Sequence, residues 1–188
     1  MLIVKEKVCK SILNKSGIAD YCLNCYTGCE NNCIYCYARF MREYTGHKEP
    51  WGEFVDVKVN APLVLEKEIR RKPKGEVFVS SVCDPYQPLE EKYQLTRKCL
   101  KILIENEFPI TILTKSTLVK RDFDILKGYS QVELGLTITT MDENLKEKIE
   151  PHSSSSQERI SVLKEASKLG IKTYCFLGPF LPFIGDRG

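Results

Sequence analysis

The chain has 188 residues, of which 43% are hydrophobic and 28% are charged, and its formal net charge is +3 at pH 7. This length supports one domain with a substantial core, and no apolar run approaches the roughly 20 residues that cross a membrane. These features exclude a membrane-spanning class, and the N-terminal MLIVKEKVCK has no signal-peptide pattern, so we expect a cytoplasmic globular protein without a membrane partner. The mild positive charge permits a nucleic-acid partner, although no dense basic stripe demands one.

The first part of the chain predicts a lead-in, residues 1–20, before a core domain that extends over residues 21–188. A cysteine-rich loop follows a short extended run, and the chain then alternates between regular elements and turns. The expected elements are an extended run at Tyr21–Asn24, a helix at Cys33–Arg42 that begins inside the loop and ends at Gly46, a strand at Phe54–Val59 and an amphipathic helix at Ala61–Arg71.

From residue 76 onward, strands and helices alternate regularly. The expected strands are Glu76–Val82, Ile110–Leu113, Gln131–Thr139 and Ile171–Leu177, and the expected helices are Glu91–Asn106, Leu118–Leu126, Glu143–Ile149 and Ser155–Leu169. Ser155 and Glu158 have the spacing of a capping box. Strands that are apolar on both faces and separated by helices indicate a parallel α/β sheet. About five strands precede the end of the chain, which is compatible with an open sheet or with part of a (β/α) barrel.

Polar and special residues follow each predicted strand. They are Ser80, Ser81, Cys83 and Asp84 after the first, Thr114 and Lys115 after the second, Thr137, Thr139 and Thr140 at the third, and Gly178 and Pro179 at the last. The carboxyl ends of parallel strands lie at one edge of a sheet or barrel, where binding sites form. The sequence therefore predicts that these residues share one site with the cysteine loop.

Three cysteines of that loop, Cys29, Cys33 and Cys36, are separated by three and then by two residues. The chain has nine cysteines, and in a cytoplasmic protein this number favours metal or redox chemistry over disulfides. Three thiolates are one short of the four that close a structural metal site. The pattern therefore predicts an iron–sulfur cluster with one iron open to another ligand.

The spacing Cys29-x3-Cys33-x2-Cys36, with Tyr35 before the last cysteine, resembles the radical S-adenosylmethionine (radical SAM) superfamily. The segments YTGCENNCIYCYA, VSSVCDPYQPLE, TILTKS and ELGLTITT are more narrowly similar to the spore photoproduct lyase-like group, often labelled DNA repair photolyases. The resemblance extends from about Asp20 to the end of the chain. It implies a partial (β/α)6 barrel of TIM type, here apparently truncated after about five strands, since full barrels rarely have fewer than about 200 residues.

The same resemblance implies a [4Fe-4S] cluster whose open iron binds the amino and carboxylate groups of S-adenosylmethionine. An external one-electron donor of the flavodoxin or ferredoxin type would reduce the site. Cleavage of the cofactor would then give a 5′-deoxyadenosyl radical that abstracts hydrogen from a substrate. The resemblance offers a DNA lesion as that substrate, with lyase-like chemistry.

By motif position, the resemblance also implies roles for particular residues. Tyr35 would contact the adenine, Ser81 would face the methionine amino group, Thr137 would lie near the ribose, Asp84 would belong to the cofactor site, and Gly178 would let the adenine approach the backbone. Spore photoproduct lyase uses a cysteine near the position of Ser81 to return a hydrogen atom. Here the cysteine is Cys83, which is either a displaced hydrogen donor or a small buried residue.

The cysteines, Asp84 and Lys115 also have simpler interpretations. Cys22-x2-Cys25 and Cys33-x2-Cys36 could form a four-cysteine zinc site in a non-catalytic module. An iron–sulfur electron carrier would need Cys25 as the fourth ligand. Asp84 precedes a proline and could simply form a turn. Lys115 could be a surface lysine or a substrate anchor.

Overall fold

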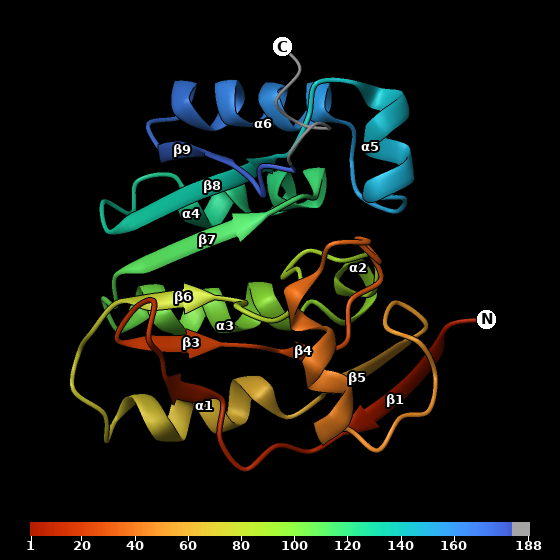
Figure 1. Ribbon diagram of the computed structural model, residues 1–188. Coiled ribbons are helices and arrows are strands. Elements are labelled where there is room, and N and C mark those ends of the chain that lie inside the picture. Colours follow the sequence, from red (N-terminus) through yellow and green to blue (C-terminus); the bar gives the residue numbers. More distant parts are fainter. Residues whose placement is uncertain (182–188) are drawn as a thin grey trace.

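Five parallel strands form the centre of the computed structural model, which describes residues 1–181. The main sheet has the order β2-β3-β6-β7-β8-β9, and only β2 runs antiparallel to its neighbour. Its strands are β2 (Leu13–Lys15), β3 (Tyr21–Leu23), β6 (Val77–Val79), β7 (Ile110–Thr114), β8 (Val132–Ile138) and β9 (Lys172–Leu177). In Figure 1 the arrowheads of β3, β6 and β7 point toward the side where the cysteine loop lies.

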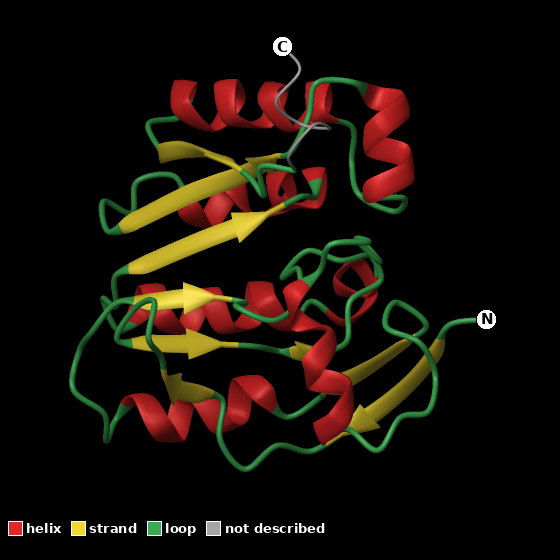
Figure 2. Cartoon of the chain, viewed as in Figure 1, coloured by secondary structure: helices red, strands yellow, loops and turns green. Residues whose placement is uncertain are grey.

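The helices cover the outside of this sheet. They are α1 (Ala61–Ile69), α2 (Leu89–Tyr93), α3 (Leu95–Glu105), α4 (Phe123–Leu126), α5 (Glu143–Ile149) and α6 (Ser156–Lys168), with 3₁₀ helices η1 (Tyr37–Tyr44) and η2 (Thr117–Asp122). α1 packs against α3, and α6 packs against β8 and β9. Figure 2 shows that the long loops gather beyond the arrowheads of the central strands. Among residues 1–181, no helix has both the length and the apolar character needed to cross a bilayer.

A second, smaller sheet lies beside the main one. It has the order β1-β5-β4 and consists of β1 (Ile3–Lys7), β5 (Phe54–Lys58) and β4 (Tyr26–Thr27). β1 runs parallel to β5, and β4 runs antiparallel to β5. Because β4 directly follows β3 of the main sheet, this small sheet anchors the chain where it enters the cysteine loop.

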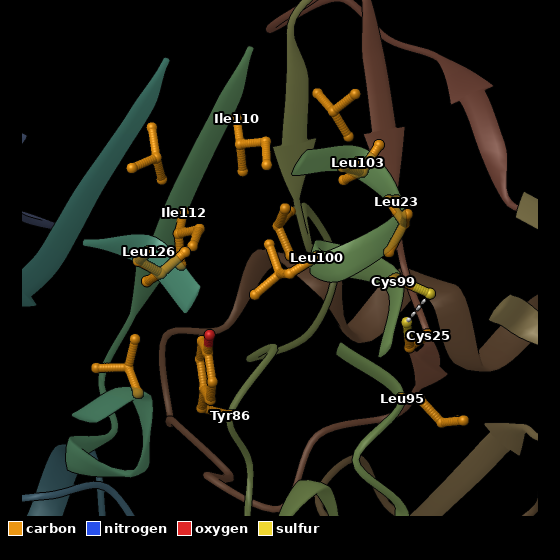
Figure 3. Close-up of a cluster of buried hydrophobic side chains, with 14 of the residues drawn as sticks. Leu23, Cys25, Tyr86, Leu95, Cys99, Leu100, Leu103, Ile110, Ile112 and Leu126 are labelled. Atoms are coloured by element: carbon orange, nitrogen blue, oxygen red, sulfur yellow. Dashed lines mark hydrogen bonds between the residues drawn. The ribbon is translucent and has the colours of Figure 1, made fainter. Parts of the chain in front are cut away.

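The main core lies between the parallel strands and the helices that cover them. Figure 3 shows part of it, with Leu100 and Leu103 of α3 in the same core as Leu23 of β3 and Ile112 of β7. Buried apolar residues on both strands and helices remove large apolar areas from water, and this burial is the main contribution to stability. The core therefore fixes the strands whose carboxyl ends form the site.

Several predicted elements are confirmed. The five parallel strands and the helix from residue 155 are present, and the capping box of Ser155 and Glu158 forms as predicted. The lead-in proves to contain two strands, β1 and β2, and Ile12 and Leu13 are fully buried in the main core. The division at residue 20 stays a prediction, and the last seven residues of the predicted core domain lie outside the described residues.

Three predicted helices were wrong in detail. The one expected over Leu118–Leu126 is the 3₁₀ helix η2 as far as Asp122, followed by the short α4. The helix expected to begin at Cys33 begins at Tyr37 and is a 3₁₀ helix. The Ile34 amide donates to the distant carbonyl oxygen of Ile149 instead of taking part in a helix. The helix expected over residues 91–106 is broken at Gln94, which adopts a left-handed conformation. The buried Glu90 carboxylate then accepts hydrogen bonds from the amides of Thr96 and Arg97, and it satisfies the first turn of α3.

Candidate active site

A cavity of about 570 Å³ opens at the carboxyl ends of the parallel strands. Its walls come from the cysteine loop, from the segments after β6, β7 and β9, and from side chains on the strands themselves, including Thr137 of β8. Nine residues to which the sequence analysis gave a role line this one cavity: Cys29, Cys33, Tyr35, Cys36, Ser81, Cys83, Asp84, Thr137 and Gly178. Thr139 and Thr140, which were expected at the same site, are absent from the described lining. The structure therefore brings together residues that are up to 149 positions apart, from Cys29 to Gly178.

The cysteine loop begins at a position that only glycine can occupy. Gly28 has φ +95°, and a Cβ atom there would lie 2.2 Å from the carbonyl oxygen of Phe54 in β5. This close approach places Cys29 beside the small sheet, where the residue is 7% exposed. Further along the loop, the Ile34 amide donates to the carbonyl oxygen of Ile149 at 2.9 Å. The cysteine loop is thus held by β5 at its start and by the end of α5 further along.

Asp84 connects three walls of the cavity. Its Oδ2 accepts from Asn31 Nδ2 of the cysteine loop at 3.0 Å and from the Lys115 amide at 2.8 Å. Its Oδ1 accepts from Thr114 Oγ1 at 2.6 Å and from the Tyr86 amide at 2.9 Å. All four contacts lie within the protein, so the carboxylate positions the loop and two strand ends. Its predicted contact with a cofactor stays a prediction.

Ser81 and Cys83 lie in the loop that follows β6. The Asn24 side chain holds this loop, because its Nδ2 donates to Ser81 Oγ at 3.3 Å and its Oδ1 accepts from the Val82 amide at 3.1 Å. The Cys83 thiol lies 3.4 Å from the Tyr26 carbonyl oxygen and 3.4 Å from Ser80 Oγ. Burial raises the pKa of Cys83 to about 12, so the thiol keeps its hydrogen at neutral pH.

A buried ion pair behind Tyr35 was not recognised from the sequence. Glu150 and Arg159 are both 0% exposed, and Arg159 Nη2 lies 2.5 Å from Glu150 Oε2. The Tyr35 hydroxyl donates to the same carboxylate, and the Thr139 hydroxyl lies 2.6 Å from its Oε1. Arg159 also donates to the carbonyl oxygen of Thr137 at 2.9 Å. This pair therefore fixes both Tyr35 and the end of β8.

Only the tertiary structure makes Glu150 and Arg159 neighbours. The sequence places them on the two sides of a serine run, where nothing distinguishes them from exposed charges. Burial alone would raise the pKa of Glu150, but the charges of Arg159 and Lys115, together with the hydrogen bonds from Thr139 and Tyr35, lower the pKa from its ordinary value. Lys115 itself lines the cavity, and its ammonium nitrogen lies 5.8 Å from the centroid of the Tyr35 ring. The structure thus favours the anchor interpretation of Lys115 over that of a surface lysine.

The three cysteines that line the cavity are donors of the kind that hold an iron–sulfur cluster. Burial raises the pKa of Cys33 to about 11, and it raises the pKa of Cys29 well above the ordinary thiol value. Without metal these thiols hold their protons, which iron binding would displace. Among the described residues, no three His, Cys, Asp or Glu side chains are grouped as ligands of a single ion. Three thiols at one end of a roomy cavity suit a larger inorganic group with an open side.

The four-cysteine zinc site is not assembled. Cys25 points into the main core, where its sulfur lies 3.7 Å from that of Cys99, as Figure 3 shows. Cys25 is 1% exposed and is absent from the described lining of the cavity that holds Cys33 and Cys36. The same geometry contradicts Cys25 as a fourth cluster ligand of an electron carrier.

The fold and the site define a class: a partial α/β barrel with a three-cysteine loop at the mouth of its cavity. The radical SAM superfamily profile matches residues 23–187. The chain belongs to the radical SAM superfamily, which is a superfamily of enzymes. An uncharacterised protein of Methanocaldococcus jannaschii is 44% identical over 98% of this chain and 70% of its own length. An uncharacterised protein of Mycobacterium tuberculosis is 32% identical over 97% of this chain and 57% of its own length.

Solved structures share the fold at low sequence identity. Spore photoproduct lyase with bound AdoMet and dinucleoside spore photoproduct matches with a TM-score of 0.73 and 17% identity over 95% of this chain. This chain spans 51% of that lyase. A "Radical SAM Nalpha-GlyT isomerase" of Pseudomonas phage M6 is 25% identical over 83% of this chain. The predicted recognition and the predicted partial barrel are confirmed.

Proposed function

We propose that the chain binds a [4Fe-4S] cluster through Cys29, Cys33 and Cys36 and uses it to cleave S-adenosylmethionine reductively. The observation that carries this proposal is the convergence of the three thiols and the other predicted site residues on one cavity. When bound, the cluster and cofactor together would supply a 5′-deoxyadenosyl radical that abstracts a hydrogen atom from the substrate. An external one-electron donor of the flavodoxin or ferredoxin type would provide the electron.

The protein's own groups would bind and orient the cofactor. Lys115 offers a cation at the cavity wall, which suits the carboxylate of S-adenosylmethionine. Tyr35, held by Glu150, presents an aromatic ring that suits the adenine, and Thr137 and Gly178 line the wall beside it. Ser81 lies in the loop after β6, where it suits the methionine amino group. The mostly apolar lining would exclude water from the radical.

Cys83 is the proposed hydrogen donor to a product radical. A donor of a hydrogen atom must keep its S–H bond, and the half-buried Cys83 thiol, whose pKa is raised to about 12, does so at neutral pH. The thiol also faces the same cavity as the cysteine loop. For the substrate we propose a lesion or modified base in DNA, because spore photoproduct lyase, which binds a dinucleoside spore photoproduct, shares the fold.

The test is anaerobic reconstitution with iron and sulfide, followed by reduction in the presence of S-adenosylmethionine. We expect about four irons per chain and formation of 5′-deoxyadenosine, and we expect a Cys29→Ser, Cys33→Ser, Cys36→Ser variant to lose both. Cys175→Ser is the matched control, because this exposed thiol lies on β9 outside the described lining of the cavity. Protein that binds four irons but forms no 5′-deoxyadenosine would contradict the proposed reaction.

The substrate proposal has its own test. Oligonucleotides that carry deuterated candidate lesions are incubated with the reduced, cofactor-loaded protein, and 5′-deoxyadenosine is analysed by mass spectrometry. Transfer of deuterium identifies the substrate. Turnover without deuterium transfer from any DNA would leave the cleavage of S-adenosylmethionine standing and would overturn DNA as the substrate.

A further inference from the structure

The indole N–H of Trp51 has no hydrogen-bond partner among the described residues, and it is the single buried side-chain polar group there in this condition. The side chain is 7% exposed, and the nitrogen itself is closed to water. Buried donors are normally paired, because an unpaired one loses its bonds to water and gains none in return. An unpaired donor in such a place indicates an acceptor that the polypeptide alone does not supply.

The surroundings of Trp51 restrict what that acceptor can be. Trp51 belongs to a small buried cluster with Cys29, Ala38 and Phe54, and Cys36 packs against the same cluster. The other side chains packed there are Ile3, Met41, Val82 and Cys83. All of these side chains are aliphatic, aromatic or sulfur-bearing. Within this apolar cluster the side-chain acceptors are sulfur atoms, and two of these sulfurs belong to the predicted cluster ligands Cys29 and Cys36.

The turn that carries Trp51 is fixed against the cysteine loop. Gly52 has φ +97°, and a Cβ atom there would lie 2.3 Å from the side chain of Asn32, which stands between Cys29 and Cys33. The indole ring meets Phe54 edge to face, with centroids 5.8 Å apart at 87°. Trp51 is absent from the described lining of the cavity, so it approaches the cysteines from the protein side and leaves the cofactor side free.

We propose that Trp51 is a positioning residue whose indole N–H donates a hydrogen bond to a sulfur of the loaded cluster site. The acceptor is the thiolate of Cys29 or Cys36, or a sulfide beside them. This inference rests on the proposed cluster. Hydrogen bonds to cluster sulfurs stabilise the reduced form, which carries one more negative charge, and they raise the reduction potential.

The decisive variant is Trp51→Phe, which keeps an aromatic ring in the cluster and removes the donor. We expect it to bind about as much iron as the wild type and to have a more negative reduction potential in an anaerobic titration followed by electron paramagnetic resonance. Met41→Leu is the matched control, because Met41 packs in the same cluster and carries no donor. We expect its potential to stay at the wild-type value.

A second measurement needs no variant. Trp51 is the only tryptophan of the chain, so indole ¹⁵N labelling reports on this one group. We expect a hyperfine coupling between the labelled nitrogen and the reduced cluster. An unchanged potential in Trp51→Phe, an equal shift in Met41→Leu, or the lack of a ¹⁵N coupling in the wild type would each overturn the inference.

The outcome also separates this inference from the proposed function. If the wild type assembles no four-iron cluster, both fail. If it assembles one and forms 5′-deoxyadenosine, but the nitrogen shows no coupling, the enzymatic function stands and only the role of Trp51 falls.

Discussion

At the scale of single residues, the cavity is held by a few buried charges that accept or donate several hydrogen bonds each. Asp84 accepts from four groups, and Glu150 accepts from Arg159, Tyr35 and Thr139. Substitution of such groups lowers the free energy of unfolding, because a buried polar atom that loses its partner is still removed from water. They also explain why the cavity can keep its shape before any cofactor binds.

Asp84→Asn tests the first of these charges. An amide can accept with only one of its two ends, so two of the four donors would face an N–H₂ group. We expect a loss of about 1–3 kcal/mol in the free energy of unfolding, measured by urea denaturation. Asp142→Asn is the control, because Asp142 is the exposed N-cap of α5, where asparagine caps equally well. Equal losses in the two variants would contradict the role of Asp84.

Glu150→Gln tests the second charge. It leaves Arg159 buried without its counter-charge, and we expect a loss of about 3–5 kcal/mol in the free energy of unfolding. Glu165→Gln breaks the half-exposed pair of Lys120 and Glu165 and should cost no more than about 1 kcal/mol. If Glu150→Gln costs no more than this control, the pair does not hold the site.

The pH dependence of stability gives the same group a second test. The folded-state pKa of Glu150 lies below its ordinary value, which is about 4.3 in the unfolded chain. The contribution of Glu150 to the free energy of unfolding is therefore complete at pH values above the unfolded-state pKa. It is lost as the pH falls through the lower, folded-state pKa. We expect thermal unfolding of the wild type to show this acid loss, and Glu150→Gln to show a shallower one. Parallel acid limbs would argue against the assignment.

At the scale of elements, the decisive feature is the glycine that starts the cysteine loop. Gly28→Ala would place a Cβ atom 2.2 Å from a backbone oxygen of β5 and would force a residue with a side chain to φ +95°. We expect a cost of at least about 1–3 kcal/mol from the backbone strain alone. We also expect less iron bound per chain after reconstitution. Gly17→Ala is the control, because no atom lies within 4 Å of its Cβ position.

The element scale also shows where sequence reasoning succeeds. The strands from residue 76 onward were predicted because their apolar runs fill both faces of a sheet, and this is a local property. The 3₁₀ start at Tyr37 and the break at Gln94 were missed because distant partners cause them. The carbonyl oxygen of Ile149 accepts a hydrogen bond from the Ile34 amide in the cysteine loop. The buried Glu90 carboxylate caps α3 from outside the helix. A local pattern carries no signal for such contacts.

At the scale of the whole molecule, the first 20 residues belong to the fold. β1 adds a strand to the small sheet, β2 covers the edge of β3, and Leu13 is fully buried in the main core. Leu13→Ala should therefore cost about 2–5 kcal/mol in the free energy of unfolding. Val8→Ala, at a position that is 80% exposed, should cost little and serves as the control. Similar unfolding midpoints for the Leu13→Ala and Val8→Ala variants would show that residues 1–20 do not contribute to the stability of the core.

The sequence by itself determined the cysteine spacing, the alternation of strands and helices, and hence the class of site and the edge of the sheet at which it forms. These are consequences of local chemistry: thiolate spacing limits the ligand, and apolar periodicity limits the element. Only the tertiary structure decided which buried charges hold Tyr35 and β8, that Cys25 belongs to the core, and that Trp51 lies beside Cys29 with a free donor. Those facts depend on contacts between residues far apart in the chain, and they exist only once the chain has folded.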